Sequence, residues 1–135
     1  MLLYLLNKEE KHRFIDLLIT VISADGPTSE TEKKIVEIVK YEMGEDAIKY
    51  RNSNMPLEKL IEYFTNKSKA IKNVVYYNIS WATLSDEFYS VEEHLILEEI
   101  QREFGITNRK KTELLKAVYA ERDLKEKIKR FARTW

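Results

Sequence analysis

Three short motifs set the strongest limits on what this chain can fold into. Each pairs a capping residue with a glutamate three positions later: Asn7 with Glu10, Ser29 with Glu32, and Ser90 with Glu93. In such a capping box the first side chain accepts a hydrogen bond from the backbone N–H of the glutamate, and the glutamate side chain returns the contact. Each motif therefore predicts the start of an α-helix.

Apolar residues recur at helical spacing along most of the chain, and this pattern predicts about seven helices. Glycines follow several of the apolar stripes and predict where those helices end, because glycine adopts the left-handed conformation of a helix C-terminus. Beyond the three capped helices, the pattern predicts one beginning near Pro56 and others at about Lys67–Leu84, Thr107–Tyr119 and Arg122–Arg133, with a short one at Met1–Leu6 or Glu45–Arg51.

The scarcity of turn residues favours an all-α fold. The chain has only 3 Gly and 2 Pro among 135 residues, too few for the many turns of a β-sandwich or β-barrel. One strand stays open as an alternative, at the β-branched and aromatic run Val74–Tyr77. We expect a single all-α domain over residues 1–135. No apolar run reaches the length of a membrane span, so we also expect a soluble, cytoplasmic protein.

Two stretches of the chain align when the sequence is shifted by 61 residues. Seven of the 20 positions from 25 to 44 are then identical, and these include Asp25 over Asp86. Capping rules account for serine, glutamate and glycine at helix ends, but no such rule requires an aspartate four residues before the cap. The alignment therefore predicts two pseudo-symmetric halves, each made of a helix, an acidic loop and a capped helix.

The same residues resemble a known family. Ile22–Gly26 followed by Ser29–Glu32 is similar to the alanine–aspartate–glycine…glutamate motif of the TerB-like tellurite-resistance proteins. The stretch 85–93 resembles the degenerate second copy of that motif, with Ser85 and Glu87 where alanine and glycine are usual. The domain also resembles the N-terminal part of the DjlA co-chaperones.

The resemblance implies an all-helical bundle of about seven helices over nearly the whole chain. It also implies a role in stress and tellurite resistance, a metal-binding acidic patch, and protein partners within a membrane-associated complex. Glu87 is a departure that bears on the second loop. Only glycine adopts a positive φ at little cost, so this loop is expected to bend differently from the first.

The acidic loops are the best candidates for a site. Asp25 and Glu32 in the first half, with Asp86 and Glu93 in the second, would pool four carboxylates if the two loops approach each other. Hard cations such as Ca²⁺ and Mg²⁺ prefer oxygen ligands, so the four residues form a candidate divalent-cation site. A purely structural role stays open, because capping and the helix dipole favour glutamate in a first helical turn without any ligand.

Other chemistry has little support in the sequence. The absence of cysteine excludes disulfides, thiolate metal sites and cysteine nucleophiles. No nucleophile elbow, phosphate loop or zinc-protease motif occurs. His12 and His94 lie far apart in the sequence and are expected to be exposed. We therefore expect a protein that is not an enzyme, with no small-molecule substrate and no cofactor besides the divalent cation.

The formal net charge is zero, but positive and negative charges are strongly separated along the chain. Residues 1–105 hold 13 Lys and Arg against 19 Asp and Glu, whereas residues 106–135 hold 10 against 4. Lys125, Lys129 and Arg133 are spaced four apart and predict a basic stripe on the last helix. This stripe either faces solvent or pairs with the acidic loops, in the same chain or in an oligomer. Nucleic acid is not the expected partner, because the whole chain is not basic.

A cluster of aromatic residues completes the sequence features. Most of its members are expected in the core and some in an exposed contact patch: Tyr76, Tyr77, Trp81, Phe88 and Tyr89. Together these features favour a stress-associated binding module with a divalent-cation site at the paired acidic loops. The alternative is a structural interaction or adaptor domain that binds no metal.

Overall fold

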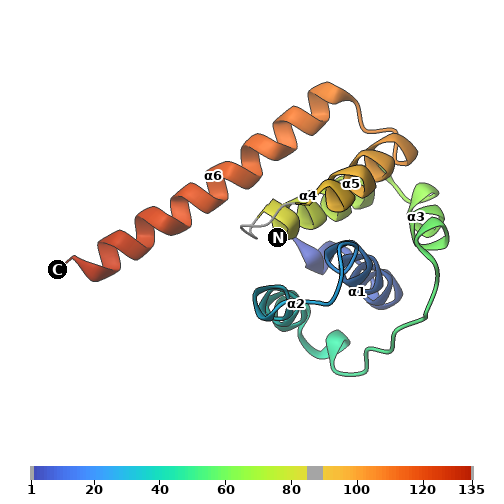
Figure 1. The fold of residues 1–135 in the computed structure, drawn as a ribbon, viewed down its shortest axis with the longest axis horizontal. Helices are drawn as coiled ribbons and strands as arrows, with labels where there is room; N and C mark the ends of the chain where they lie inside the picture. The colour runs from blue at the N-terminus through green and yellow to red at the C-terminus, as the bar shows by residue number, and fades with distance from the viewer. Residues whose placement is uncertain (1, 85–89, 135) are drawn as a thin grey trace.

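A computed structural model describes residues 2–84 and 90–134 of the chain, and every regular element within them is helical (Figure 1). This confirms the predicted all-α class. No helix among the described residues is both long and apolar enough to cross a membrane. The elements follow in the order η1 (Leu3–Leu5), α1 (Lys8–Ile22), α2 (Glu30–Met43), η2 (Gly44–Ala47), α3 (Leu57–Thr65), α4 (Lys69–Leu84), α5 (Val91–Glu103) and α6 (Asn108–Arg133).

The predicted capping motifs start three of these helices. Asn7 Oδ1 accepts from Glu10 N, and Glu10 Oε1 accepts from Asn7 N, each at 2.8 Å, at the start of α1. Ser29 and Glu32 form the same reciprocal pair at α2. At α5, Ser90 Oγ accepts from Glu93 N. These starts are predictable because the hydrogen bonds of a first turn need no tertiary partner.

Helix α1 lies at the centre of the body and contacts α2, α3, α4 and α5. Figure 1 shows it with α2 below and with α4 and α5 above. Its inner face is completely buried, and a fully buried side chain of this size contributes about 1.5–3 kcal/mol. This face is the main part of the core, formed by Phe14, Ile15, Leu17, Leu18 and Val21.

Helix α4 is the second core helix, and it contacts α1, α3, α5 and α6. Because neighbours surround it, Val75, Tyr76 and Trp81 are all buried although they point in different directions. The strand alternative for residues 74–77 is therefore wrong, since packing on several sides outweighs β propensity. Tyr77 is half-buried, so the three described members of the predicted aromatic cluster form no exposed patch. Phe88 and Tyr89 lie outside the described residues.

Two of the predicted elements differ in the structure. The helices expected at 107–119 and 122–133 are one continuous helix, α6, because no glycine or proline interrupts the chain after its N-cap, Thr107. The two alternatives for a further short helix are both single 3₁₀ turns, η1 and η2. The described residues thus form six α-helices instead of about seven.

Candidate cation site

A tight turn between α1 and α2 places Asp25 at the surface. The turn is closed by a hydrogen bond from Gly26 N to Ser23 O at 3.3 Å and by a contact of 2.9 Å between the hydroxyl oxygens of Ser23 and Thr28. Gly26 has a φ of 135°, which a side chain would strain. The glycine of the sequence motif is therefore required by the backbone conformation, and it holds the preceding aspartate at the tip of the turn.

The first turn of α2 supplies the second carboxylate. Glu32 Oε1 accepts a hydrogen bond from Ser29 N at 2.8 Å, and Ser29 Oγ accepts from Glu32 N at 3.1 Å. The Glu32 side chain is only 5% exposed. Capping accounts for one oxygen of this carboxylate and leaves the second oxygen for another contact.

The first turn of α5 supplies the third carboxylate, from a part of the chain about sixty residues away. Ser90 Oγ accepts from Glu93 N at 3.1 Å and lies 3.3 Å from Glu93 Oε1. Glu93 is 1% exposed and is among the most deeply buried side chains of the protein. An ionised group at such a position is costly unless hydrogen bonds or a counter-charge stabilise it.

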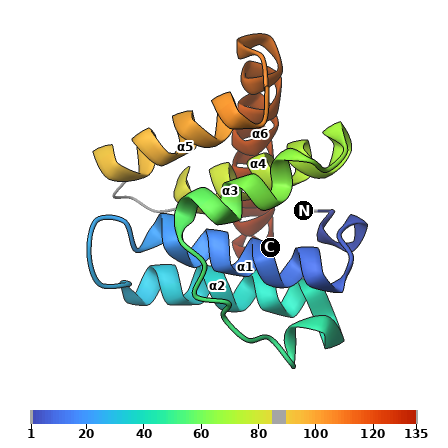
Figure 2. The same ribbon diagram turned by 90° about the vertical axis from the view of Figure 1, so that its right-hand side faces the viewer.

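The structure brings three of the four predicted ligands together. One carboxylate oxygen from each of Asp25, Glu32 and Glu93 lies within 4.8 Å of the others. Figure 2 shows why: the α1–α2 connection and the start of α5 lie on the same side of the molecule. The fourth predicted ligand, Asp86, lies outside the described residues.

The chemistry of this cluster suits a hard cation. Ca²⁺ takes six to eight oxygen ligands, and Mg²⁺ takes six, of which several are usually water. The three carboxylates could supply up to half of such a shell. The partial positive charge at two helix N-termini, those of α2 and α5, stabilises the carboxylates but is smaller than their combined charge.

The histidines take no part in this cluster. His12 was expected to be exposed, but it is half-buried, and its Nε2 lies 2.6 Å from Asp46 O. The reason is that the 44–56 segment folds back over α1, which the sequence does not indicate. His94 is exposed as predicted, and its Nε2 lies 3.0 Å from Glu98 Oε1.

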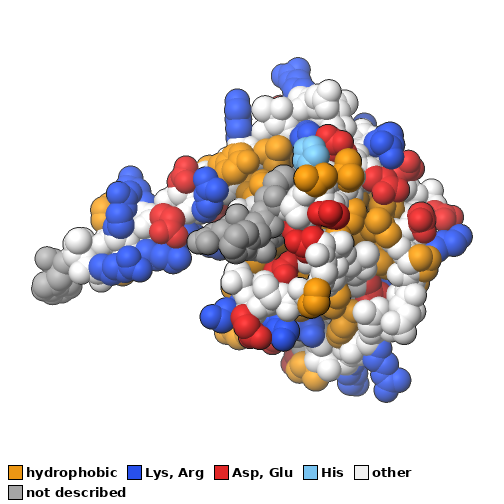
Figure 3. Space-filling view, viewed as in Figure 1, with side chains coloured by type: hydrophobic (Ala, Val, Ile, Leu, Met, Phe, Trp, Pro, Cys, Tyr) orange, Lys and Arg blue, Asp and Glu red, His pale blue; other side chains and the backbone are white. Residues whose placement is uncertain are grey.

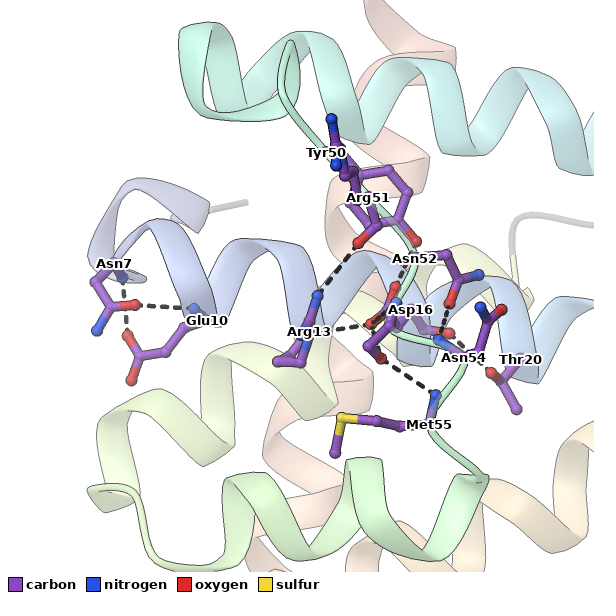
Figure 4. Close-up of polar contacts among 11 residues, drawn as sticks. Asn7, Glu10, Arg13, Asp16, Thr20, Tyr50, Arg51, Asn52, Asn54 and Met55 are labelled. Carbon is purple, nitrogen blue, oxygen red and sulfur yellow. Dashed lines mark hydrogen bonds and ion pairs between the residues drawn. The ribbon is translucent and has the colours of Figure 1, made fainter.

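Sequence reasoning missed a buried polar network around Asp16 (Figure 4). This carboxylate is 2% exposed and accepts hydrogen bonds from the Tyr50 hydroxyl and from Ser53 Oγ, the latter at 2.7 Å. It also pairs with Arg13 Nε at 3.0 Å. An aspartate on the apolar face of a predicted helix is the one signal that could have revealed it. The network fastens the long segment between η2 and α3 onto α1.

Comparison of the chain with family models, curated proteins and solved structures gives no match. The resemblance to the TerB-like proteins accordingly depends on the residues of the acidic loops alone.

Proposed function

We propose that this protein is a non-enzymatic binding module that takes a divalent cation, Ca²⁺ or Mg²⁺, between the α1–α2 turn and the start of α5. The observation that carries the proposal is the convergence of Asp25, Glu32 and Glu93, whose oxygens lie within 4.8 Å of one another. The two glutamates are buried and come from helices far apart in the sequence. A cation would offset the repulsion among the three carboxylates.

The resemblance to TerB-like proteins supports the biological part of the proposal. On this basis the module acts in stress or tellurite resistance, within the cytoplasm, and joins protein partners in a membrane-associated complex. The two pseudo-symmetric halves would each contribute one acidic loop, with Asp86 as the counterpart of Asp25 in the 61-residue alignment. Cation binding would then tie the two loops together and fix the surface that a partner meets.

The cluster can be tested directly by calorimetric titration with Ca²⁺ and with Mg²⁺. The proposal predicts binding of one cation per chain, weakened at least tenfold in the E32Q/E93Q variant. Glutamine also serves in a capping box, so this variant keeps the helix starts. The matched control is E30Q/E92Q, which removes two exposed first-turn charges from the same helices. It should bind as wild type does, and absence of binding by wild type would refute the cation site.

A second function, a structural adaptor without metal, is favoured by one observation. The Oε1 atoms of Glu32 and Glu93 both contact their capping serines. If capping is their whole role, E32A and E93A each lose about 1 kcal/mol of stability, and cations change nothing.

A further inference from the structure

The distal half of α6 leaves the body of the protein. Val118 is the last buried residue of this helix, and every described residue from Arg122 to Thr134 is exposed. Figure 1 shows this part of α6 extending away from all other elements. At 1.5 Å per residue it projects by about 18 Å. This part of the helix gains little stability from packing within its own chain, since it contacts the body through Lys125, which lies over the Trp81 ring.

The projecting part nevertheless carries an apolar stripe. Leu124, Ile128 and Phe131 are 56%, 55% and 66% exposed, and their spacing of four and three residues places them on one face. Lysines and arginines surround this face, and Figure 3 shows them along the projecting helix. An exposed apolar stripe within a basic helix is typical of a surface that docks on an acidic, partly apolar partner.

The outer face of α3 and α5 is acidic and partly apolar, which complements the basic, partly apolar tail of α6. Val91 and Leu95 of α5 are exposed and lie four residues apart on one face. Further along α5, a groove between α3 and α5 is lined by Ile61, Thr65 and four glutamates: Glu58, Glu62, Glu99 and Glu103. This α3–α5 face therefore combines exposed apolar side chains with negative charge.

The tail of α6 cannot reach the α3–α5 face of its own chain. Figure 1 shows the tail pointing away from the body, with α3 on the far side of the body and α5 between α3 and the first half of α6. Residues 106–135 hold an excess of six positive charges, and residues 1–105 hold an excess of six negative charges. The basic tail of one copy is therefore attracted to the acidic body of another copy.

We propose that the α6 tail of one copy docks on the α3–α5 face of a second copy of this chain. The apolar stripe would cover Val91 and Leu95, while the basic side chains face the groove glutamates. Because the two surfaces are different and the tail points away from its own body, the contact is head-to-tail and leaves a free surface at each end. It therefore builds open chains whose mass grows with protein concentration. This contact does not involve the cation cluster.

The test uses two charge-reversal variants in sedimentation and light scattering at low salt. The tail variant is K127E/R130E, and the face variant is E62K/E103K; all four positions are exposed. Wild type should associate progressively with concentration and dissociate as salt shortens the Debye length below about 10 Å. Each variant alone should be a monomer. An equal mixture should associate again, because the intact tail of the face variant can dock on the intact face of the tail variant.

A control variant, K34E/K49E, reverses two exposed lysines of α2 and the following segment and should associate as wild type does. Circular dichroism of each variant establishes that the fold is retained. Three results would overturn the proposal: a wild-type monomer at all concentrations, association that the face variant does not reduce, or a mixture that stays monomeric. Monomeric wild type that binds anionic phospholipid vesicles through α6 would instead assign the tail to a membrane surface.

Discussion

The three carboxylates of the cluster differ in their burial and in their hydrogen bonds to neighbouring residues. Glu32 and Glu93 are buried and each contacts a capping serine, whereas Asp25 is exposed at the tip of its turn. Two unit charges about 5 Å apart repel by roughly 1 kcal/mol at the dielectric constant of water, and by more in the interior. Asp25 therefore adds repulsion without a compensating cap, unless a cation is present.

This contrast predicts that Asp25→Asn has opposite effects on the free energy of unfolding in the absence and in the presence of the cation. In chelator the variant should be more stable than wild type by up to about 1 kcal/mol, because one repulsive charge is gone. In excess Ca²⁺ it should be less stable, because a ligand is gone. Urea denaturation in the two buffers gives both free energies of unfolding. Equal effects in both buffers would show that Asp25 is not a ligand.

The contact between α1 and the 44–56 segment depends on Asp16. We expect Asp16→Ala to lower the free energy of unfolding by about 3–5 kcal/mol, because it leaves the half-buried donors of Arg13, Tyr50 and Ser53 without their acceptor. Urea denaturation measures the loss. Asp123→Ala, at an exposed aspartate of α6, should change stability by less than about 0.5 kcal/mol. A small loss at Asp16 would mean that the network contributes little to folding.

Helix α6 has two halves with different roles. Its first half packs on α4, where Val118 is buried and Glu121 accepts a hydrogen bond from the Tyr77 hydroxyl. The second half contacts the body through Lys125, whose ammonium lies 5.2 Å from the Trp81 ring centre. The division falls near residue 121, and the two halves can be separated experimentally.

A chain ending after Glu121 should keep its cooperative unfolding and lose no more than about 1 kcal/mol of stability, the size of one cation–π contact. Ending the chain after Thr107 should instead destabilise it severely, because this exposes the face of α4 that α6 covers. Thermal unfolding followed by circular dichroism measures both. A severe loss in the longer chain would show that the projecting half belongs to the folded core.

At the scale of the whole molecule, several tyrosines couple stability to alkaline pH. Burial raises the pKa of Tyr63 to about 12, and burial together with the carboxylates of Asp16 and Glu121 raises the pKa of Tyr50 and of Tyr77. Above pH 10 the unfolded chain loses these protons before the folded protein does. The folded state then binds more protons, so stability is full below about pH 10 and falls as the pH rises.

We expect the free energy of unfolding to decline between pH 10 and pH 12, and the decline to be shallower in Tyr50→Phe and Tyr77→Phe. Urea denaturation across this range measures the slope. Tyr41→Phe is the matched control, because Tyr41 is 89% exposed, and its slope should equal that of wild type. An unchanged slope in both test variants would contradict the role assigned to the hydroxyls of Tyr50 and Tyr77.

The sequence predicts local features of this fold well and distant contacts less well. Helix starts at Asn7, Ser29 and Ser90 follow from hydrogen bonds within one turn, so four residues suffice to find them. The sequence did not predict the continuity of α6. The apolar pattern changes near residue 120, and this change was read as a break between two helices although the chain continues as one helix there. The Asp16 network was missed because it joins α1 to a segment more than thirty residues away, and no local pattern encodes that contact.

The candidate cation site was partly predictable, less so than the helix starts and more so than the Asp16 network. The 61-residue alignment led to Glu32 and Glu93 as equivalent residues, and the fold places their carboxylates beside Asp25. The alignment could suggest this meeting but not its burial, because burial depends on how α5 packs over α1 and α3.

The most direct measurement of the central claim is the melting temperature of wild type with and without a divalent cation. A cation that binds only the folded state adds about 2.7 kcal/mol at a hundredfold excess over Kd. For a domain of this size the melting temperature should then rise by several degrees in millimolar Ca²⁺ or Mg²⁺. The rise should vanish in the D25N/D86N variant. A wild-type melting temperature that neither cation changes would contradict the cation site.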